Sequence, residues 1–188
     1  MGADTAVPST VFLDRDGTIN VKAPEGEYIT SPDDLELLPG AARAVRLLND
    51  AGVEVVVVTN QRGIARGLMS EDDHTAVTEA LTRKLAQRGA TVRAVYHCPH
   101  ETGTCTCRKP APGLIERART ELADLDLTGA ALVGDSESDV EAGRRAGLRT
   151  VLLADPDGPR AVATDADHVV PSLLDAARWL VSGAAALT

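Results

Sequence analysis

Short runs of β-branched and aliphatic residues alternate along the chain with longer segments in which apolar residues recur every three or four positions. The short runs predict six strands, at Thr10–Leu13, Val53–Val58, Val92–Tyr96, Ala130–Val133, Thr150–Leu153 and His168–Val170. Because these runs are almost uninterrupted by polar residues, we expect strands that are covered on both faces. Strands that alternate with helices predict an α/β fold with a mostly parallel central sheet.

Helix start signals stand between the predicted strands, at Gly40, Ser70, Pro112 and Ser138. Ser70 and Ser138 each have an acidic residue three positions on, Asp73 and Glu141, which predicts a capping box at both helix starts. A last helix contains Trp179. No repeat or linker-like tract divides the chain, so the pattern predicts a single domain over residues 1–188.

The charge balance narrows the range of partners. The 188 residues include 28 Asp and Glu against 19 Lys and Arg, which gives a formal net charge of −9. This acidity argues against binding to nucleic acid or to an anionic membrane through a basic face. Aromatic residues make up only 2% of the chain, so stacking platforms for bases are scarce. No coiled-coil seam is visible, and we expect a monomer.

The N-terminal segment M-G-A-D-T-A-V-P-S-T lacks the basic start and apolar run of a secretory signal. The longest apolar stretches are far too short to cross a bilayer. We therefore expect a cytoplasmic protein without a membrane partner.

Polar residues follow three of the predicted strands at the point where each strand ends. The first strand continues into Asp14 and Asp16, the second into Thr59-Asn60-Gln61, and the fourth into Gly134-Asp135-Ser136-Glu137-Ser138-Asp139. Ligands of open α/β sheets bind at this edge. Paired carboxylates there favour a hard divalent cation such as Mg²⁺, which offsets their repulsion. The alternatives are local: Asp-Gly is common in turns, Thr59 could cap, and Asp139 could favour a helix start.

All three cysteines lie within ten residues, in the pattern C-x-H-x₄-C-x-C from Cys98 to Cys107. Three thiolates and one imidazole suit a structural, tetrahedral Zn²⁺ site, with Cys98, His100, Cys105 and Cys107 as ligands. His97 could replace His100. Small buried hydrophobes and redox chemistry are the weaker alternatives, and there is no C-x-x-C.

Four segments, V-F-L-D-R-D-G-T-I-N, T-N-Q-R-G-I-A-R-G, C-R-K-P and G-D-S-E-S-D, resemble the successive motifs of the haloacid dehalogenase-like phosphatases. Within that family they resemble the branch that contains heptose-bisphosphate and histidinol-phosphate phosphatases. The resemblance runs from Val11 to Leu153. It implies a three-layer Rossmann-like fold with a small flap at Val21–Ser31 after the first strand, a zinc loop and no large cap domain.

The resemblance also implies roles for individual residues. Asp14 would be the nucleophile that forms an aspartyl-phosphate, and Asp16 the general acid and base. Asp14, the backbone carbonyl of Asp16, and Asp135 would hold Mg²⁺, with Asp139 supporting them. Thr59 would donate a hydrogen bond to the phosphoryl group and Lys109 would neutralise its charge.

Substrate contacts are expected from Asn60, Gln61, Arg62, Arg108 and Lys109, and the resemblance favours His100 over His97 in the zinc loop. Many relatives carry Lys directly after the fourth-motif aspartate, where this chain has Ser136. His74 and His168 are interpreted as ordinary surface or strand-edge residues.

Together with these residues, the resemblance implies a Mg²⁺-dependent phosphomonoesterase that acts on a small phosphorylated sugar, with heptose 1,7-bisphosphate favoured at its 7-phosphate. The alternatives are a histidinol-phosphate phosphatase, a polynucleotide 3′-phosphatase, and a catalytically silent binding module stabilised by zinc.

Overall fold

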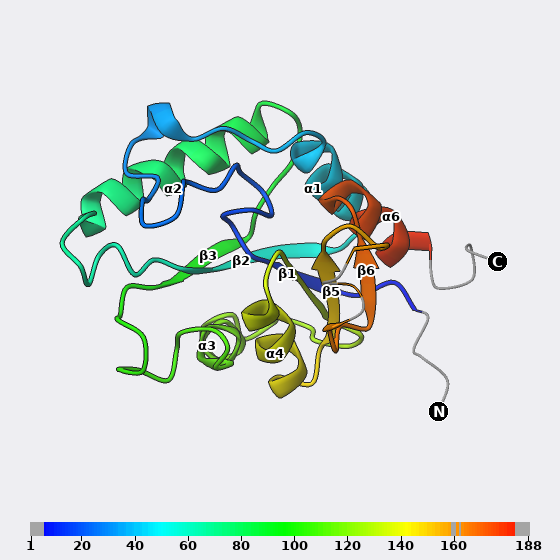
Figure 1. The fold of residues 1–188 in the computed structure, drawn as a ribbon. Coiled ribbons are helices and arrows are strands. Elements are labelled where there is room, and N and C mark those ends of the chain that lie inside the picture. The colour runs from blue at the N-terminus through cyan, green and yellow to red at the C-terminus, as the bar shows by residue number, and fades with distance from the viewer. Residues whose placement is uncertain (1–5, 159–160, 162, 183–188) are drawn as a thin grey trace.

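A six-stranded parallel sheet forms the centre of the molecule, and the computed structural model describes residues 6–158, 161 and 163–182 around it (Figure 1). The strands are β1 (Thr10–Leu13), β2 (Glu54–Asn60), β3 (Ala94–Cys98), β4 (Ala131–Gly134), β5 (Arg149–Leu153) and β6 (His168–Val170). Each predicted strand is confirmed, with ends that differ by at most two residues. Their order in the sheet is β3-β2-β1-β4-β5-β6.

Helices cover both faces of this sheet. They are α1 (Ala41–Asp50), α2 (Glu71–Ala86), α3 (Gly113–Glu121), α4 (Glu137–Arg145) and α6 (Leu173–Ser182), with a short 3₁₀ helix η1 (Pro32–Asp34). Figure 1 shows α1, α2 and α6 on one face and α3 and α4 on the other. The three-layer α/β prediction is therefore confirmed.

The alternation of side chains along the strands builds two apolar clusters. Val11 and Leu13 of β1 pack in the cluster beneath α1, α2 and α6, whereas Phe12 packs with α3 on the opposite face. Both neighbours of Phe12 point to the other face because successive strand residues alternate. This two-sided burial explains why the strands are apolar without interruption.

One predicted helix start is wrong. The fourth helix begins at Glu137 and not after Ser138, because Ser136 is still extended and serves as the N-cap. The Ser136 backbone N–H donates to Asp139 Oδ2 over 3.1 Å, and its hydroxyl donates to the same oxygen over 2.5 Å. The acidic partner of the cap is thus Asp139, and Glu141 is not involved. The predicted capping box at Ser70 and Asp73 is confirmed.

The interpretation of His74 as a surface residue is also wrong. Its side chain lies on the inner side of α2 and is only 4% exposed. Burial, followed by the nearby charge of His97, lowers the pKa of His74 to about 3. His168 lies half-buried at the sheet edge, stacked on Trp179.

The longest connection between the described elements runs from β1 to α1, over residues 14–40. It contains η1 and the flap, residues Val21–Ser31, and no large cap domain interrupts it. The flap is fastened to the rest of the connection because Val21 donates its backbone N–H to the Glu36 carbonyl over 2.8 Å. In the part of the chain that the structure describes, no helix is both long and apolar enough to cross a bilayer.

Candidate active site

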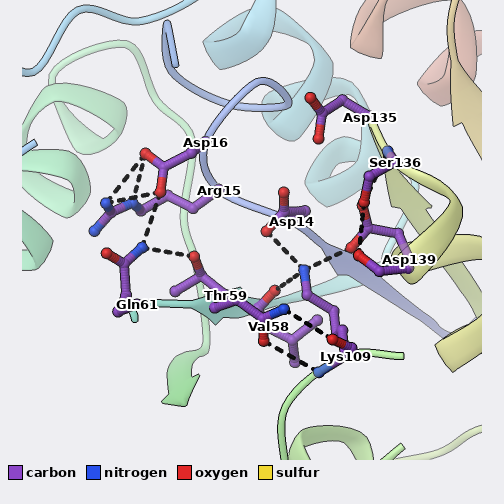
Figure 2. A network of polar contacts seen from close by, with 12 residues as sticks. Asp14, Arg15, Asp16, Val58, Thr59, Gln61, Lys109, Asp135, Ser136 and Asp139 are labelled. Carbon is purple, nitrogen blue, oxygen red and sulfur yellow. Dashed lines mark hydrogen bonds and ion pairs between the residues drawn. The ribbon is translucent and has the colours of Figure 1, made fainter. Parts of the chain in front are cut away.

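The carboxyl ends of β1, β2 and β4 open into a cavity of about 350 Å³. These three strands are neighbours in the sheet, so the polar residues that follow them meet at one edge. The flap lines another side of the cavity, from Lys22 to Ile29, and Arg108 and Lys109 complete the lining. Figure 2 shows the side chains that converge there.

Asp14 follows β1 directly and is 8% exposed. Its Oδ1 accepts a hydrogen bond from Lys109 Nζ over 2.7 Å. Burial raises the pKa of Asp14 to about 7, against the opposing effect of the Lys109 ammonium group. The carboxylate is therefore held in one orientation by a fixed positive charge.

Lys109 is buried, and its ammonium group has a partner for each of its three hydrogens. It donates to Asp14 over 2.7 Å and to the Val58 carbonyl over 2.8 Å, and its nitrogen lies 2.6 Å from Asp139 Oδ1. Burial alone would lower the pKa of Lys109, but the two carboxylates raise it, so the group is charged at neutral pH. The amide of Asn60 binds the main chain of Lys109 twice, at 3.1 Å each, and so fixes this residue beside β2.

Asp16 is turned away from Asp14, as Figure 2 shows. Arg15, which is completely buried, binds the Asp16 carboxylate with two nitrogens, the shortest contact being 2.9 Å. Asn20 and Gln61 add amide hydrogen bonds of 2.9 and 2.8 Å. Burial favours the protonated form, but the Arg15 charge and these hydrogen bonds together lower the pKa of Asp16. In this orientation Asp16 is an anion.

The residues predicted to contact substrate lie at different depths. Asn60, Arg108 and Lys109 line the cavity. Gln61 is buried and donates to both Asp16 and Thr59, at 2.8 Å each. Arg62 pairs with Glu101 over 3.4 Å and is not part of the cavity lining.

The carboxylates of Asp14, Asp135 and Asp139 come together, with one oxygen of each inside a group no wider than 4.8 Å. Carboxylate oxygens are ligands of the kind that Mg²⁺ prefers. The Asp16 side chain is not in this group. Gly17, at φ +89°, passes so close that a Cβ there would lie 2.4 Å from Asp135 Oδ2. Only glycine therefore fits after Asp16 without displacing the Asp135 carboxylate.

Cys98, His100, Cys105 and Cys107 form a compact cluster on the loop that leads from β3 to Lys109. The sulfur–sulfur distances are 3.3 to 3.5 Å, and His100 Nδ1 lies 3.3 Å from Cys107 Sγ. Tetrahedral zinc with bonds of about 2.3 Å needs sulfurs about 3.8 Å apart, so a small expansion accommodates the ion. His97 does not join this cluster, because its Nε2 lies 2.9 Å from Glu71 Oε2.

Two residues of the site were not singled out from the sequence. Arg15 orients Asp16. Its position between two aspartates is the feature of the sequence that could have identified it. Lys22 of the flap extends to Asp135, with a distance of 3.0 Å from its ammonium nitrogen to Oδ2. The flap carried no periodic pattern, so nothing in the sequence indicated this contact.

Residues 106–176 match the model of the HAD-hydrolase-like family. The match agrees with the contents of the cavity, where a buried carboxylate is held by an ammonium group beside two further carboxylates. The fold and the site, together with this match, define the protein as a haloacid dehalogenase-like hydrolase.

Relatives that match most of the chain identify the family within this class. The chain is 37% identical over 180 residues to the D-glycero-β-D-manno-heptose-1,7-bisphosphate 7-phosphatase of Yersinia pestis, covering 90% of this chain and 93% of that protein. It is 36% identical over 162 residues to the D-glycero-α-D-manno-heptose-1,7-bisphosphate 7-phosphatase of Photorhabdus laumondii, covering 82% of this chain and 86% of that protein. The crystal structure of D,D-heptose 1,7-bisphosphate phosphatase from B. bronchiseptica, complexed with magnesium and phosphate, has a TM-score of 0.82 and 35% identity, covering 93% and 98%. The chain belongs to the family of D-glycero-D-manno-heptose-1,7-bisphosphate 7-phosphatases and is a phosphatase.

Proposed function

We propose that the protein removes the 7-phosphate of D-glycero-D-manno-heptose 1,7-bisphosphate through an aspartyl-phosphate on Asp14. The observation that carries this proposal is the buried Asp14 carboxylate, fixed 2.7 Å from Lys109 at the floor of the cavity. The relatives named above act on this class of substrate, and one of them binds magnesium and phosphate.

In the first step an Asp14 oxygen attacks phosphorus, and the bond between phosphorus and the sugar oxygen breaks. Negative charge on the transferring phosphoryl oxygens is balanced by the Lys109 ammonium group. The Thr59 hydroxyl, at the end of β2, is placed to donate to one of these oxygens. In the second step water attacks the aspartyl-phosphate and frees Asp14.

Asp16 has to move before it can protonate the leaving sugar oxygen. Against Arg15 it is held as an anion, which is the wrong state for an acid. Rotation toward the cavity would separate it from the guanidinium group and let its pKa rise, so that it can carry a proton to the leaving oxygen. The resulting carboxylate can then accept a proton from the attacking water.

Asp14 and Asp135, with the Asp16 carbonyl, would hold Mg²⁺, and Asp139 would support them from within the same carboxylate group. The ion supplies positive charge against the phosphoryl oxygens when it is bound. Zinc in the cysteine loop would have a structural role, because it constrains the segment that places Arg108 and Lys109. We expect the protein to act as a monomer in the cytoplasm.

Arg108 supports a substrate with a second phosphate. Its side chain lines the cavity, and its buried Nη1 has no hydrogen-bond partner among the described residues. A buried guanidinium nitrogen without a partner is a ready donor to an anionic oxygen. We assign this nitrogen to the 1-phosphate, which stays on the sugar while the 7-phosphate leaves.

The test compares kcat/KM for heptose 1,7-bisphosphate, heptose 7-phosphate, histidinol phosphate and several hexose phosphates in the presence of Mg²⁺. We expect the bisphosphate to be preferred at least tenfold. Arg108→Met should reduce kcat/KM for the bisphosphate about 10- to 100-fold and leave that for heptose 7-phosphate nearly unchanged. A tenfold preference for histidinol phosphate would overturn the substrate assignment and support the rival activity.

A further inference from the structure

Two histidines and a glutamate come together outside the catalytic cavity and outside the zinc loop. Glu71 is the first residue of α2, His74 follows one turn later, and His97 lies near the end of β3. One ligand atom from each residue lies inside a group no wider than 4.8 Å. We call these three side chains the α2–β3 cluster.

The α2–β3 cluster is separate from the cysteine loop although His97 precedes Cys98 in the sequence. Tyr96 and Cys98 pack in the apolar cluster on the α3 face of the sheet. Because side chains alternate along a strand, His97 projects toward the opposite face, where α2 lies. The two groups of ligands therefore occupy different sides of β3.

One imidazole of the α2–β3 cluster has a buried nitrogen without a hydrogen-bond partner among the described residues. His74 is 4% exposed, and its buried Nε2 has no hydrogen-bond partner among the described residues. Leaving such an atom unsatisfied destabilises a fold, so a partner that is either a water molecule or an ion is expected there in the native protein. The His74 and His97 rings lie side by side, with 4.0 Å between centroids and a tilt of 33°.

Glu71 closes the third side of the cluster. It is exposed, and its Oε2 lies 2.9 Å from His97 Nε2. A glutamate and a histidine three residues apart lie on the same side of a helix, a spacing that metal sites in helical bundles also use. The exposed carboxylate leaves the cluster open to ions from solvent.

Two imidazoles and one carboxylate suit zinc and related transition ions better than Mg²⁺. Ligand atoms at about 2.0 to 2.2 Å from a tetrahedral ion are about 3.3 Å apart. The His97–Glu71 contact would have to widen by only about 0.4 Å to reach this spacing. Arg15, the nearby cation that acts on His74, is already paired with Asp16 at 2.9 Å, which reduces its repulsion of an ion.

We propose that Glu71, His74 and His97 form a second transition-metal site, which binds Zn²⁺ with one coordination position left to water. A buried water molecule on His74 is the rival occupant. The two occupants differ in a measurable way, because only the metal site changes the zinc stoichiometry of the protein.

The experiment uses the full chain with zinc in the cysteine loop and the catalytic carboxylates saturated with millimolar Mg²⁺. Zn²⁺ is the probe, bound metal is measured after equilibrium dialysis, and the melting temperature is followed in parallel. The variants are Glu71→Gln and His97→Gln. The controls are Asp72→Asn, an exposed carboxylate in the same helical turn, and His168→Gln, a histidine outside the cluster.

We expect two equivalents of zinc in the wild type and in both controls. Glu71→Gln and His97→Gln should keep the first equivalent and bind the second at least tenfold more weakly, with a smaller zinc-dependent rise in melting temperature. Glu71→Gln is decisive because it lies away from the cysteine loop. A wild type that takes up one equivalent would overturn the proposal. A second equivalent that survives in both variants would also overturn it, because the ion would then lie elsewhere.

Discussion

Replacing Lys109 by methionine should destabilise the Mg²⁺-free protein strongly. The ammonium nitrogen lies 2.7 Å from Asp14 and 2.6 Å from Asp139, and both carboxylates are buried. Methionine fills similar space but leaves both acids without a counter-charge and the Val58 carbonyl without its donor. Removing one partner of a buried ion pair costs about 3–5 kcal/mol, and with two acids affected we expect a loss near 5 kcal/mol.

The assay is urea unfolding at pH 7.5 with the zinc loop loaded, and a double-mutant cycle with Asp14→Asn isolates the interaction. Asp14→Asn removes one of the two carboxylates that Lys109→Met leaves without a counter-charge. The free energy of unfolding of the Lys109→Met/Asp14→Asn double variant should therefore be about 2 kcal/mol higher than the sum of the two single losses predicts. Saturating Mg²⁺ should recover more stability in Lys109→Met than in the wild type. A loss below about 1 kcal/mol, or losses that add within about 0.5 kcal/mol, would show that Lys109 does not balance the charges of the two buried carboxylates.

Three further changes test other parts of the site. Because the pKa of Asp14 is raised to about 7 in the folded protein, the folded state binds that proton more tightly than the unfolded chain does. The Mg²⁺-free wild type should therefore lose stability as the pH rises from about 4 to 7. Asp14→Asn should lack this pH-dependent loss, as urea unfolding at several pH values will report. Cys105→Ser should lower the zinc content and reduce kcat by loosening Lys109, as metal analysis and phosphate release will report, whereas retention of zinc and activity would contradict the zinc-loop assignment. Gly17→Ala should weaken Mg²⁺ activation about tenfold or more, because its Cβ would lie 2.4 Å from an Asp135 oxygen, and an unchanged Mg²⁺ dependence would argue against that crowding.

The sequence predicted the features of the fold and the site that depend on residues close together in the chain. Uninterrupted apolar runs predicted the strands, since both faces of this sheet are covered. Because parallel strands end at one edge, the predicted positions of Asp14, Thr59 and Asp135 followed from the order of elements alone. The cysteine spacing predicted a compact cluster, which the structure shows.

Features that depend on contacts between distant segments could not be predicted. The orientation of Asp16 depends on Gln61, 45 residues away, as well as on its neighbour Arg15. The burial of His74 depends on how α2 packs over the sheet, and a single histidine in a helix carries no signal for that. The helix start at Ser136 was missed because Ser138 and Glu141 offered an equally good local capping pattern.

The most direct test of the account is the hydrolysis of heptose 1,7-bisphosphate by the wild type and by Asp14→Asn, with and without Mg²⁺, followed by ³¹P NMR. If Asp14 is the nucleophile, we expect Mg²⁺-dependent loss of the 7-phosphate, retention of the 1-phosphate, and a fall in kcat of at least about 10³-fold in Asp14→Asn. Asp72→Asn, at an exposed aspartate that does not line the cavity, should keep wild-type turnover. Wild-type turnover by Asp14→Asn would contradict the assignment of Asp14 as the nucleophile, and release of the 1-phosphate instead would contradict the proposed 7-phosphatase activity.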